Sequence, residues 1–256
     1  MTRVLIVLPS SSYRVADFVA AAKMLRAETV IATNAAQTMA GDMAYPLVRI
    51  DPRNPEWSAG RIVEFAQRFP LDAVVAADEE GVVMAALAAR ELGLPHNPPE
   101  AVRVTRDKAA MRQVFADAAL PQPLFRVIGA DDDPVAACSE VGFPCVVKPV
   151  SLSASRGVIR VDGIDEVADT VARIRTITAE AGRDPSEPIL AESFVPGTEV
   201  ALEGLLVDGH LEVLALFDKP DPMNGPYFEE TILVTPSRLA HHVQDEIAAI
   251  SGAAAD

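Results

Sequence analysis

Cysteine is scarce in this sequence of 256 residues, which contains only Cys138 and Cys145. The pair lacks a Cys-x-x-Cys spacing, and the pattern around it predicts that one residue lies in a helix and the other in a strand. Neither a disulfide framework nor a zinc site follows from such a pair. A reducing compartment, the cytoplasm, is the natural location for a protein of this kind.

Positive charge is also scarce. The sequence has 22 Lys and Arg residues against 37 Asp and Glu residues, which gives a formal net charge of −15 at pH 7. Nucleic acids and anionic membranes need a net basic face, so this balance argues against both as partners. It does not exclude a nucleotide, because a pocket needs only a few local cations.

Long apolar runs and a dinucleotide fingerprint are missing as well. The first apolar run, residues 4–8, is too short for the core of a signal peptide, and no later run approaches transmembrane length. No Gly-x-Gly-x-x-Gly follows that run, so the sequence lacks the signature of a dinucleotide-binding turn. With 50% hydrophobic residues, the chain is long enough for one or two soluble domains with a sizeable core.

Short apolar runs alternate with helical patterns in the first part of the chain. We expect strands at residues 4–8, 29–32, 47–50 and 73–76, with helices after the first, third and fourth strands. Strands that alternate with helices predict a parallel sheet with helical crossovers, so the fold class is α/β. The Pro-dense stretch at residues 94–99 is the best boundary, and we place the N-terminal domain at residues 1–97.

Polar side chains follow two of these expected strands. Ser11, Ser12, Tyr13 and Arg14 come after the first strand, and Glu79 comes after the fourth. Ligands of open parallel sheets bind beyond the carboxyl ends of the strands, so these five residues are candidates for the substrate side. The alternative is that a serine caps a helix and that the acid favours a helix N-terminus.

The second part of the chain is organised around Lys148. An apolar run at residues 143–147 predicts a buried strand that delivers this lysine, and Pro149 should end the strand because it has no N–H to donate. A loop of small residues with Arg156 follows, and residues 157–161 predict the returning strand. Backbone N–H and hydroxyl groups can approach a polyphosphate closely while the two cations offset its charge. The alternative is an exposed hairpin with a solvated Lys and Arg.

A helix is expected from Asp107 to about residue 119. Asp107 can cap its start, which leaves Lys108 near a helix end that attracts anions. Its inward residues should be Met111, Val114, Phe115 and Ala118.

The remaining elements are expected further along the chain. We predict strands at residues 124–128, 189–192 and 232–234, helices at residues 134–141 and 164–181, and a last helix from Pro236-Ser237 to about residue 250. Residues 199–206 and 211–217 should form a hairpin around Asp208-Gly209, a strong turn signal. His241 and His242 fall on a helix with a solvated face, so we assign no metal ligand.

These segments occur in an order that resembles the ATP-grasp superfamily of carboxylate–amine (or thiol) ligases. The matching pieces, in chain order, are Arg106-Asp107-Lys108, Val147-Lys148-Pro149, residues 151–157, residues 192–199, Asp218-Lys219-Pro220, Phe228-Glu229-Glu230 and Thr235-Pro236-Ser237. Tyr13-Arg14 and residues 94–97 are similar to the N-terminal domain of the branch with L-amino-acid ligases and carnosine-synthase-like enzymes. Each piece is weak alone, and the resemblance, which covers nearly the whole chain, depends on their order and spacing.

The resemblance implies an ATP site. Lys108 and Lys148 would contact the phosphates and the adenine edge, and the loop around Ser153, Ser155 and Gly157 would close over the β- and γ-phosphates. The residues implied to hold adenine and ribose are Glu192, Phe194, Val195 and Glu199. For Glu199 the alternative is an acid on the wet face of a strand.

The resemblance also implies a reaction. ATP would phosphorylate a small carboxylate, and an amine would attack the acyl phosphate, with positioning and charge neutralisation supplying most of the catalysis. Arg156 and Lys219 would act near the phosphates, and Glu229 and Glu230 would lie on the substrate side. For Lys219 the alternative is an ordinary loop lysine. The resemblance allows a homodimer, and it names neither the carboxylate nor the amine.

Two departures from the family pattern matter. Family members carry, further along, a strand pair with Glu- and Asn-type Mg²⁺ ligands and an Arg for the substrate carboxylate, so we expect the Mg²⁺ ligands beyond Asp256. The sequence would then be a fragment, an artificially shortened chain or a degenerate member. Leu233 replaces a His of the amino-acid ligases, which puts an amino-acid substrate in doubt.

The resulting hypothesis has an N-terminal parallel α/β domain followed by an incomplete ATP-grasp α+β region. Linker helices would occupy residues 98–120, the small ATP-grasp subdomain residues 121–191, and part of the large subdomain residues 192–256. The expected function is an ATP-dependent amide-forming ligase whose nucleotide half is this chain. The alternatives are a nucleotide-binding protein without ligase activity and a carboxylase or formyltransferase of the purine pathway on the same fold.

Overall fold

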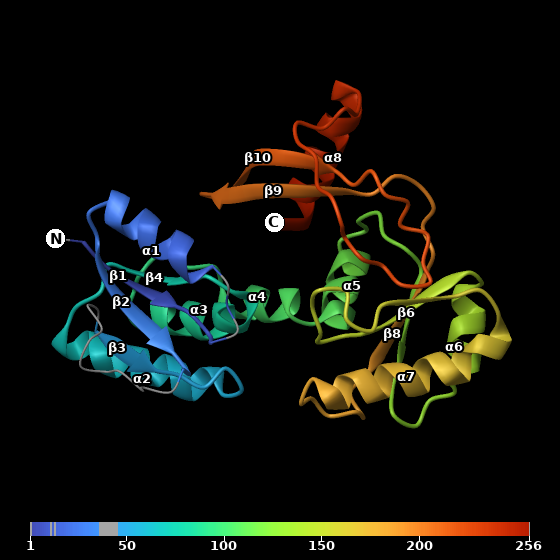
Figure 1. The fold of residues 1–256 in the computed structure, drawn as a ribbon, viewed down its shortest axis with the longest axis horizontal. Coiled ribbons are helices and arrows are strands. Elements are labelled where there is room, and N and C mark those ends of the chain that lie inside the picture. The colour runs from blue at the N-terminus through green and yellow to red at the C-terminus, as the bar shows by residue number, and fades with distance from the viewer. Residues whose placement is uncertain (1, 11, 13, 36–45, 256) are drawn as a thin grey trace. The chain divides into compact units, whose positions relative to one another are not determined.

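The structure is a computed structural model that describes residues 2–10, 12, 14–35 and 46–255. The candidates Ser11 and Tyr13 lie outside the described residues. Contacts divide the chain into two units, Met1–Arg106 and Asp107–Asp256. Figure 1 shows the elements of each unit, which are described separately below.

The first unit contains a four-stranded parallel sheet with the strand order β3-β2-β1-β4. Its strands are β1 (Arg3–Val7), β2 (Glu28–Thr33), β3 (Leu47–Arg49) and β4 (Ala73–Ala76). The helical elements are α1 (Val15–Met24), α2 (Pro55–Arg68), the short η1 (Glu79–Gly81), α3 (Val82–Glu91) and α4 (Pro99–Thr105). The parallel α/β layer expected from the sequence is confirmed.

Strand β1 is covered on both faces, which explains its unbroken apolar sequence. Leu5 and Val7 belong to a core with Ile62 of α2 and Met84 of α3. The alternate residues of the same run pack into a second core with Ala22 of α1. Successive side chains of a strand point to opposite faces, so only a continuous apolar run satisfies two helical layers at once.

The second unit contains a four-stranded antiparallel sheet with the order β5-β8-β6-β7. The strands are β5 (Phe125–Ile128), β6 (Cys145–Pro149), β7 (Ile159–Val161) and β8 (Ile189–Ser193). The helical elements are α5 (Lys108–Asp117), α6 (Pro134–Val141), the short η2 (Ile164–Glu166) and α7 (Val167–Glu180). Cys138 and Cys145 are buried in the core of this sheet and carry free thiols.

A two-stranded antiparallel sheet follows in the same unit, formed by β9 (Val200–Val207) and β10 (His210–Asp218). Asp208 and Gly209 connect the strands with φ angles of 51° and 79°. Positive φ at both central residues is what a type I′ hairpin turn needs, so the expected Asp-Gly hairpin is confirmed. The last element is α8 (His241–Ala255), and His241 and His242 are exposed at its start.

Several expected boundaries were wrong at the ends of elements. The predicted end of strand β6 at Pro149 is confirmed, and this residue still pairs with Ile189, where its missing N–H removes only a terminal bond. The strand begins at Cys145 rather than residue 143. Strand β7 begins at Ile159 rather than residue 157, because the N–H of Val158 still closes a turn onto Ser155.

Three further predictions in the second unit were wrong. Residues 232–234 form no strand, and only Val234 pairs, in a single bridge with Asp218. The last helix begins at His241 rather than Pro236, because Ser237 and Arg238 are bonded to the Asp218 carboxylate. The apolar face predicted for α5 is not a core face, since this helix has no buried residue.

No helix in the described part of the chain is both long and apolar enough to span a membrane.

Candidate active site

The loop between β6 and β7 has a tight, small-residue backbone. Ala154, Ser155 and Gly157 have φ angles of 56°, 54° and 74°. The N–H of Arg156 donates to the carbonyl of Ser153 at 3.3 Å, which closes a turn. A Cβ on Gly157 would lie 3.1 Å from Cδ of Pro149, so the two ends of the loop contact each other. Ser155 and Arg156 are exposed at its tip, where an incoming group could meet them.

The Glu192 carboxylate forms a buried cluster with two cations. Its two oxygens accept from Nε of Arg112 and Nζ of Lys148, each at 2.6 Å. The side chains of Glu192, Lys148 and Arg112 are 7%, 15% and 16% exposed. Burial alone would raise the pKa of Glu192, but the Lys148 ammonium and the Arg112 guanidinium outweigh it and hold the pKa below its ordinary value. The carboxylate is therefore charged and oriented.

Lys108 lies against the chain that leaves β6. Its N–H donates to the carbonyl of Val150 at 3.2 Å, and its Nζ donates to the carbonyl of Leu152. Asp107 accepts from Ala109 N at 2.9 Å as the N-cap of α5, as the sequence predicted. Lys108 therefore contacts the start of the loop, and Lys148 precedes that loop on β6.

Phe194 is the first residue after β8, and its backbone still bonds to the segment that precedes β6. Its N–H donates to the carbonyl of Pro144 at 3.1 Å, and the guanidinium of Arg160 lies 4.5 Å from the centre of its ring. Val195, the next residue, is 66% exposed. Phe194 and Val195 follow Glu192 closely in sequence, and their role in holding a base stays a prediction.

A second ionic cluster contains Lys219. Its Nζ donates to the carboxylates of both Glu199 and Glu230, and its N–H donates to the carbonyl of Glu199 at 3.2 Å. Burial alone would lower the pKa of Lys219, but the two carboxylates outweigh it and raise the pKa above its ordinary value. Glu229, the neighbour of Glu230 in sequence, is exposed and makes no hydrogen bond to Lys219.

The loop of residues 219–237 is closed by Asp218. Its carboxylate accepts from Oγ of Ser237 at 2.5 Å and from N of Arg238 at 3.0 Å. The hydrogen bond from Ser237 and the backbone bond from Arg238 lower the pKa of Asp218. The loop thus begins and ends at the same strand, β10.

The candidates of the first unit make local contacts. Oγ of Ser12 accepts from N of Arg14, the residue that precedes α1, at 3.4 Å. Glu79 forms an ion pair with Arg106 of the same unit. Helix α1 has no side-chain cap, so Ser12 does not cap it, and the substrate role of these residues stays a prediction.

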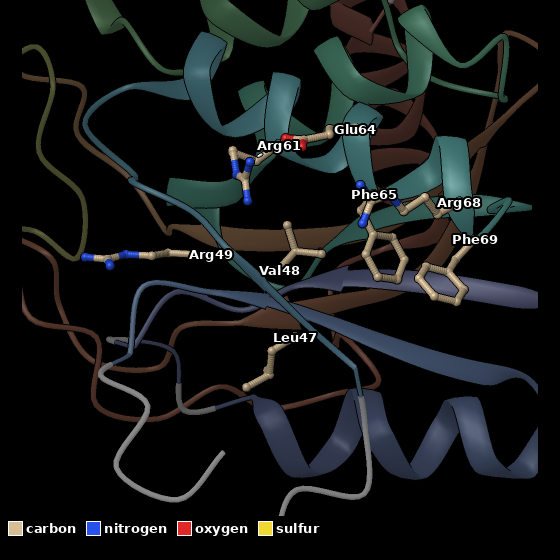
Figure 2. Close-up of a pocket in the computed structure, with 8 residues that line it drawn as sticks. All are labelled: Leu47, Val48, Arg49, Arg61, Glu64, Phe65, Arg68 and Phe69. Carbon is tan, nitrogen blue, oxygen red and sulfur yellow. Dashed lines mark hydrogen bonds and ion pairs between the residues drawn. The ribbon is translucent and has the colours of Figure 1, made fainter. Parts of the chain in front are cut away.

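A separate surface pocket of the first unit contains none of the predicted site residues (Figure 2). Leu47, Val48 and Arg49 of β3 contribute to it, together with Arg61, Glu64, Phe65 and Arg68 of α2 and the adjoining Phe69. Arg61 is paired with Glu64, and the rings of Phe65 and Phe69 are stacked with their centres 5.1 Å apart.

Arg112 and Arg160 are the residues that sequence reasoning missed in the second unit. Arg112 lies four positions after Lys108 on α5, and residues at that spacing share a helix face. That spacing could have indicated Arg112. For Arg160 the only sequence signal was its place in the strand that follows the loop.

Two protein-family models match this chain. The ATP-grasp domain family matches residues 141–255, and the ATP-grasp N-terminal domain family matches residues 19–96. The alanine–anticapsin ligase of Bacillus subtilis strain 168 is 29% identical over 203 residues, which cover 73% of this chain and 42% of the relative. The D-alanine–D-alanine ligase of Aromatoleum aromaticum is 26% identical over 175 residues, which cover 67% of this chain and 54% of the relative.

A solved structure shares the fold. The L-amino acid ligase from Bacillus licheniformis superimposes with a TM-score of 0.80 at 24% identity, over 99% of this chain and 59% of that one. This chain therefore spans about two fifths of the length of the alanine–anticapsin ligase and about three fifths of the L-amino acid ligase.

Proposed function

Since this chain belongs to the ATP-grasp superfamily, we propose that its second unit binds ATP for the formation of an amide bond between a small carboxylate and an amine. The observation that carries the proposal is the grouping of Lys108, Lys148 and Glu192 around the loop of residues 150–158. In domain terms, residues 121–191 would be the small ATP-grasp subdomain and residues 192–256 part of the large one.

The proposed roles follow from charge and shape. Lys108 and Lys148 would neutralise the phosphates, and the Ser153–Gly157 loop would cover them with hydroxyl and N–H donors. Glu192, with Phe194 and Val195, would hold the adenine, while Glu199 would accept the ribose hydroxyls. Positioning of this kind is what phosphoryl transfer requires from a protein.

The proposed chemistry has two steps. A carboxylate oxygen attacks the γ-phosphorus, ADP leaves, and an acyl phosphate forms. The amine then attacks the acyl carbon, inorganic phosphate leaves, and the amine loses a proton. Arg156 at the tip of the loop and Lys219 would stabilise charge on the transferred phosphoryl group, and Glu229 and Glu230 would lie on the substrate side.

Mg²⁺ would supply further charge neutralisation at the phosphates when it is bound. Among residues 2–10, 12, 14–35 and 46–255, no group of three or more His, Cys, Asp or Glu side chains could hold a metal ion. The carboxylates of Glu199 and Glu230 are both engaged by Lys219. The proposal therefore assigns none of the described residues as a metal ligand.

Calorimetry with ATP and Mg²⁺ tests the proposal. We expect ATP to bind, and we expect Lys148→Met to weaken binding by about tenfold or more, since it removes a charge-assisted contact. Arg173→Met is the matched control, because Arg173 is an exposed cation on α7. Equal binding by both variants, or no binding by the unaltered chain, would contradict the proposal.

Measurement of ATP turnover distinguishes the ligase from the two alternative functions. Release of ADP that depends on both an added carboxylate and an added amine supports the ligase. ATP binding without such release supports a nucleotide-binding protein without ligase activity. Release with bicarbonate or formate and an amino-bearing purine precursor would instead support the carboxylase or formyltransferase reading.

A further inference from the structure

Residues 224–227, which we call the crossing segment, lie against the free edge of β7. β7 is an edge strand of the sheet β5-β8-β6-β7. The N–H of Arg160 donates to the carbonyl of Pro226 at 2.9 Å, and Ile159 forms an antiparallel bridge with Tyr227. The crossing segment therefore extends the sheet by main-chain pairing, as a peptide does when it adds to an exposed sheet edge.

The side chain of Arg160 holds the crossing segment a second time. Its Nη1 donates to the carbonyl of Asn224 at 2.8 Å, and its Nε donates to Asp162 at 2.6 Å. The same guanidinium lies 4.5 Å from the centre of the Phe194 ring. A guanidinium can donate within its plane while its face stacks on an aromatic ring. One side chain thus joins the crossing segment to Phe194.

Gly225 fits the crossing segment closely to Arg160. Its φ of +85° favours glycine, and a Cβ at this position would lie 2.8 Å from Cβ of Arg160. A larger residue would have to displace either the segment or the Arg160 side chain. A substitution at either Gly225 or Arg160 should therefore disturb the contact between the crossing segment and Arg160.

The crossing segment belongs to the loop that carries the proposed substrate-side acids. That loop begins after Asp218, and Glu229 and Glu230 follow the crossing segment within it. β7 directly follows the loop around Ser155 that we assign to the phosphates. The contact at Arg160 therefore connects the proposed nucleotide site with the proposed substrate side.

We infer that Arg160 is a positioning residue that clamps the loop of residues 219–237 to the nucleotide site, so that a nucleotide beside Phe194 orders this loop. A base that packs on Phe194 fixes the ring, the ring fixes the guanidinium, and the guanidinium fixes the crossing segment. The nucleotide stabilises the clamped loop only because it binds the clamped form more tightly than the released form. The part of this inference that concerns the nucleotide rests on the proposed function. The contact between Arg160 and the crossing segment does not.

Cleavage by chymotrypsin after Tyr227 and Phe228 measures release of the loop. The Tyr227 side chain is 67% exposed, but proteolysis also requires the paired backbone to open. Without nucleotide, Arg160→Met should be cut about tenfold faster than the unaltered chain, since it removes the stacking and the charged hydrogen bond. Arg160→Lys should recover only part of the protection, because it keeps the charge without the planar fork. Arg173→Met, the control, should be cut at the original rate.

Added ATP should slow cleavage of the unaltered chain and of Arg173→Met. In Arg160→Met, ATP should still bind in calorimetry but should give little protection. A merely structural role for Arg160 would lower thermal stability without separating binding from protection, so this separation is the decisive readout. Cleavage and ATP protection that are unchanged in Arg160→Met would overturn the inference.

Gly225→Ala provides a second route that leaves Arg160 in place. Its added Cβ should release the crossing segment and raise the cleavage rate as Arg160→Met does. Gly163→Ala is the matched control, since a Cβ there meets no atom within 4 Å and its φ of −160° suits any residue. Equal cleavage of the two alanine variants would overturn the clamp even if Arg160→Met failed to fold. If the unaltered chain bound no ATP, the coupling to nucleotide would fall with the proposed function, while nucleotide-free cleavage would still decide the clamp.

Discussion

The guanidinium Nε of Arg112 lies 2.6 Å from the carboxylate of Glu192, a residue eighty positions later in the chain. This pair ties α5 to β8, and Lys148 of β6 bonds the other oxygen of the same carboxylate. If the Lys148 ammonium turns toward a phosphate, Arg112 still neutralises the buried acid. The second cation therefore allows the first to serve a ligand without leaving an unpaired buried charge.

Removal of Arg112 should destabilise the second unit. In Arg112→Met the Glu192 carboxylate keeps only Lys148, and we expect a loss of about 1–3 kcal/mol in the free energy of unfolding. Arg126→Met is the control, because Arg126 and its partner Glu140 are both more than half exposed and such a pair contributes about 0–1 kcal/mol. Urea denaturation measures both free energies of unfolding. Equal losses in the two variants would show that burial of the Arg112–Glu192 pair does not increase its contribution to stability.

Stability in acid should depend on Glu192. Its pKa is lower in the folded protein than its unfolded value of about 4.3, because the two cations outweigh the effect of burial. A carboxyl of this kind contributes stability above the unfolded pKa, and the contribution is lost as the pH falls through the folded pKa. We expect Glu192→Gln to be less stable at pH 7 and to lose less on acidification below about pH 5. Parallel stability curves for the two proteins, measured by urea unfolding from pH 7 to pH 3, would refute this expectation.

The elements that were predicted correctly have local signals. Residues 4–8 are continuously apolar because Leu5 and Ile6 face different helical layers. Asp208-Gly209 predicts its hairpin through backbone conformation alone. The apolar run at residues 232–234 carries a similar local signal, yet it forms no strand, and Leu233 is 47% exposed. An apolar run forms a strand only where a free sheet edge is available for it to pair with. The local sequence of the run does not show whether such an edge is present.

The candidate site was predictable only in its separate parts. The order of Lys108, Lys148 and the small-residue loop indicated a phosphate site, and the structure places these residues together in the second unit. The ionic partners were not predictable, since Arg112 meets Glu192 across eighty residues and Arg160 meets Asn224 across sixty-four. Such pairs depend on how strands and loops come together in three dimensions, which spacing along the chain does not encode.

The backbone of the loop between β6 and β7 should be sensitive at Gly157. Its φ of +74° is unfavourable for other residues, and a Cβ would press on the Pro149 ring at 3.1 Å. We expect Gly157→Ala to cost about 1–2 kcal/mol of stability and to weaken ATP binding several-fold. Gly163→Ala, which meets open space, should change neither quantity by much. Thermal unfolding and calorimetry on the two variants make the comparison, and identical behaviour would show that the conformation at Gly157 does not matter.

Lys219 should be coupled to Glu230 far more strongly than to the adjacent Glu229. The Lys219 ammonium is buried and bonds Glu230, whereas Glu229, which is exposed like Glu230, makes no hydrogen bond to Lys219. A double-mutant cycle with Lys219→Met and Glu230→Gln should give a coupling free energy of about 1–2 kcal/mol, and the same cycle with Glu229→Gln should give close to zero. Denaturant unfolding supplies the four stabilities that each cycle needs. Because the two acids are neighbours in sequence and equal in charge, similar couplings would mean that Lys219 senses only the general negative field of the loop and not a specific partner.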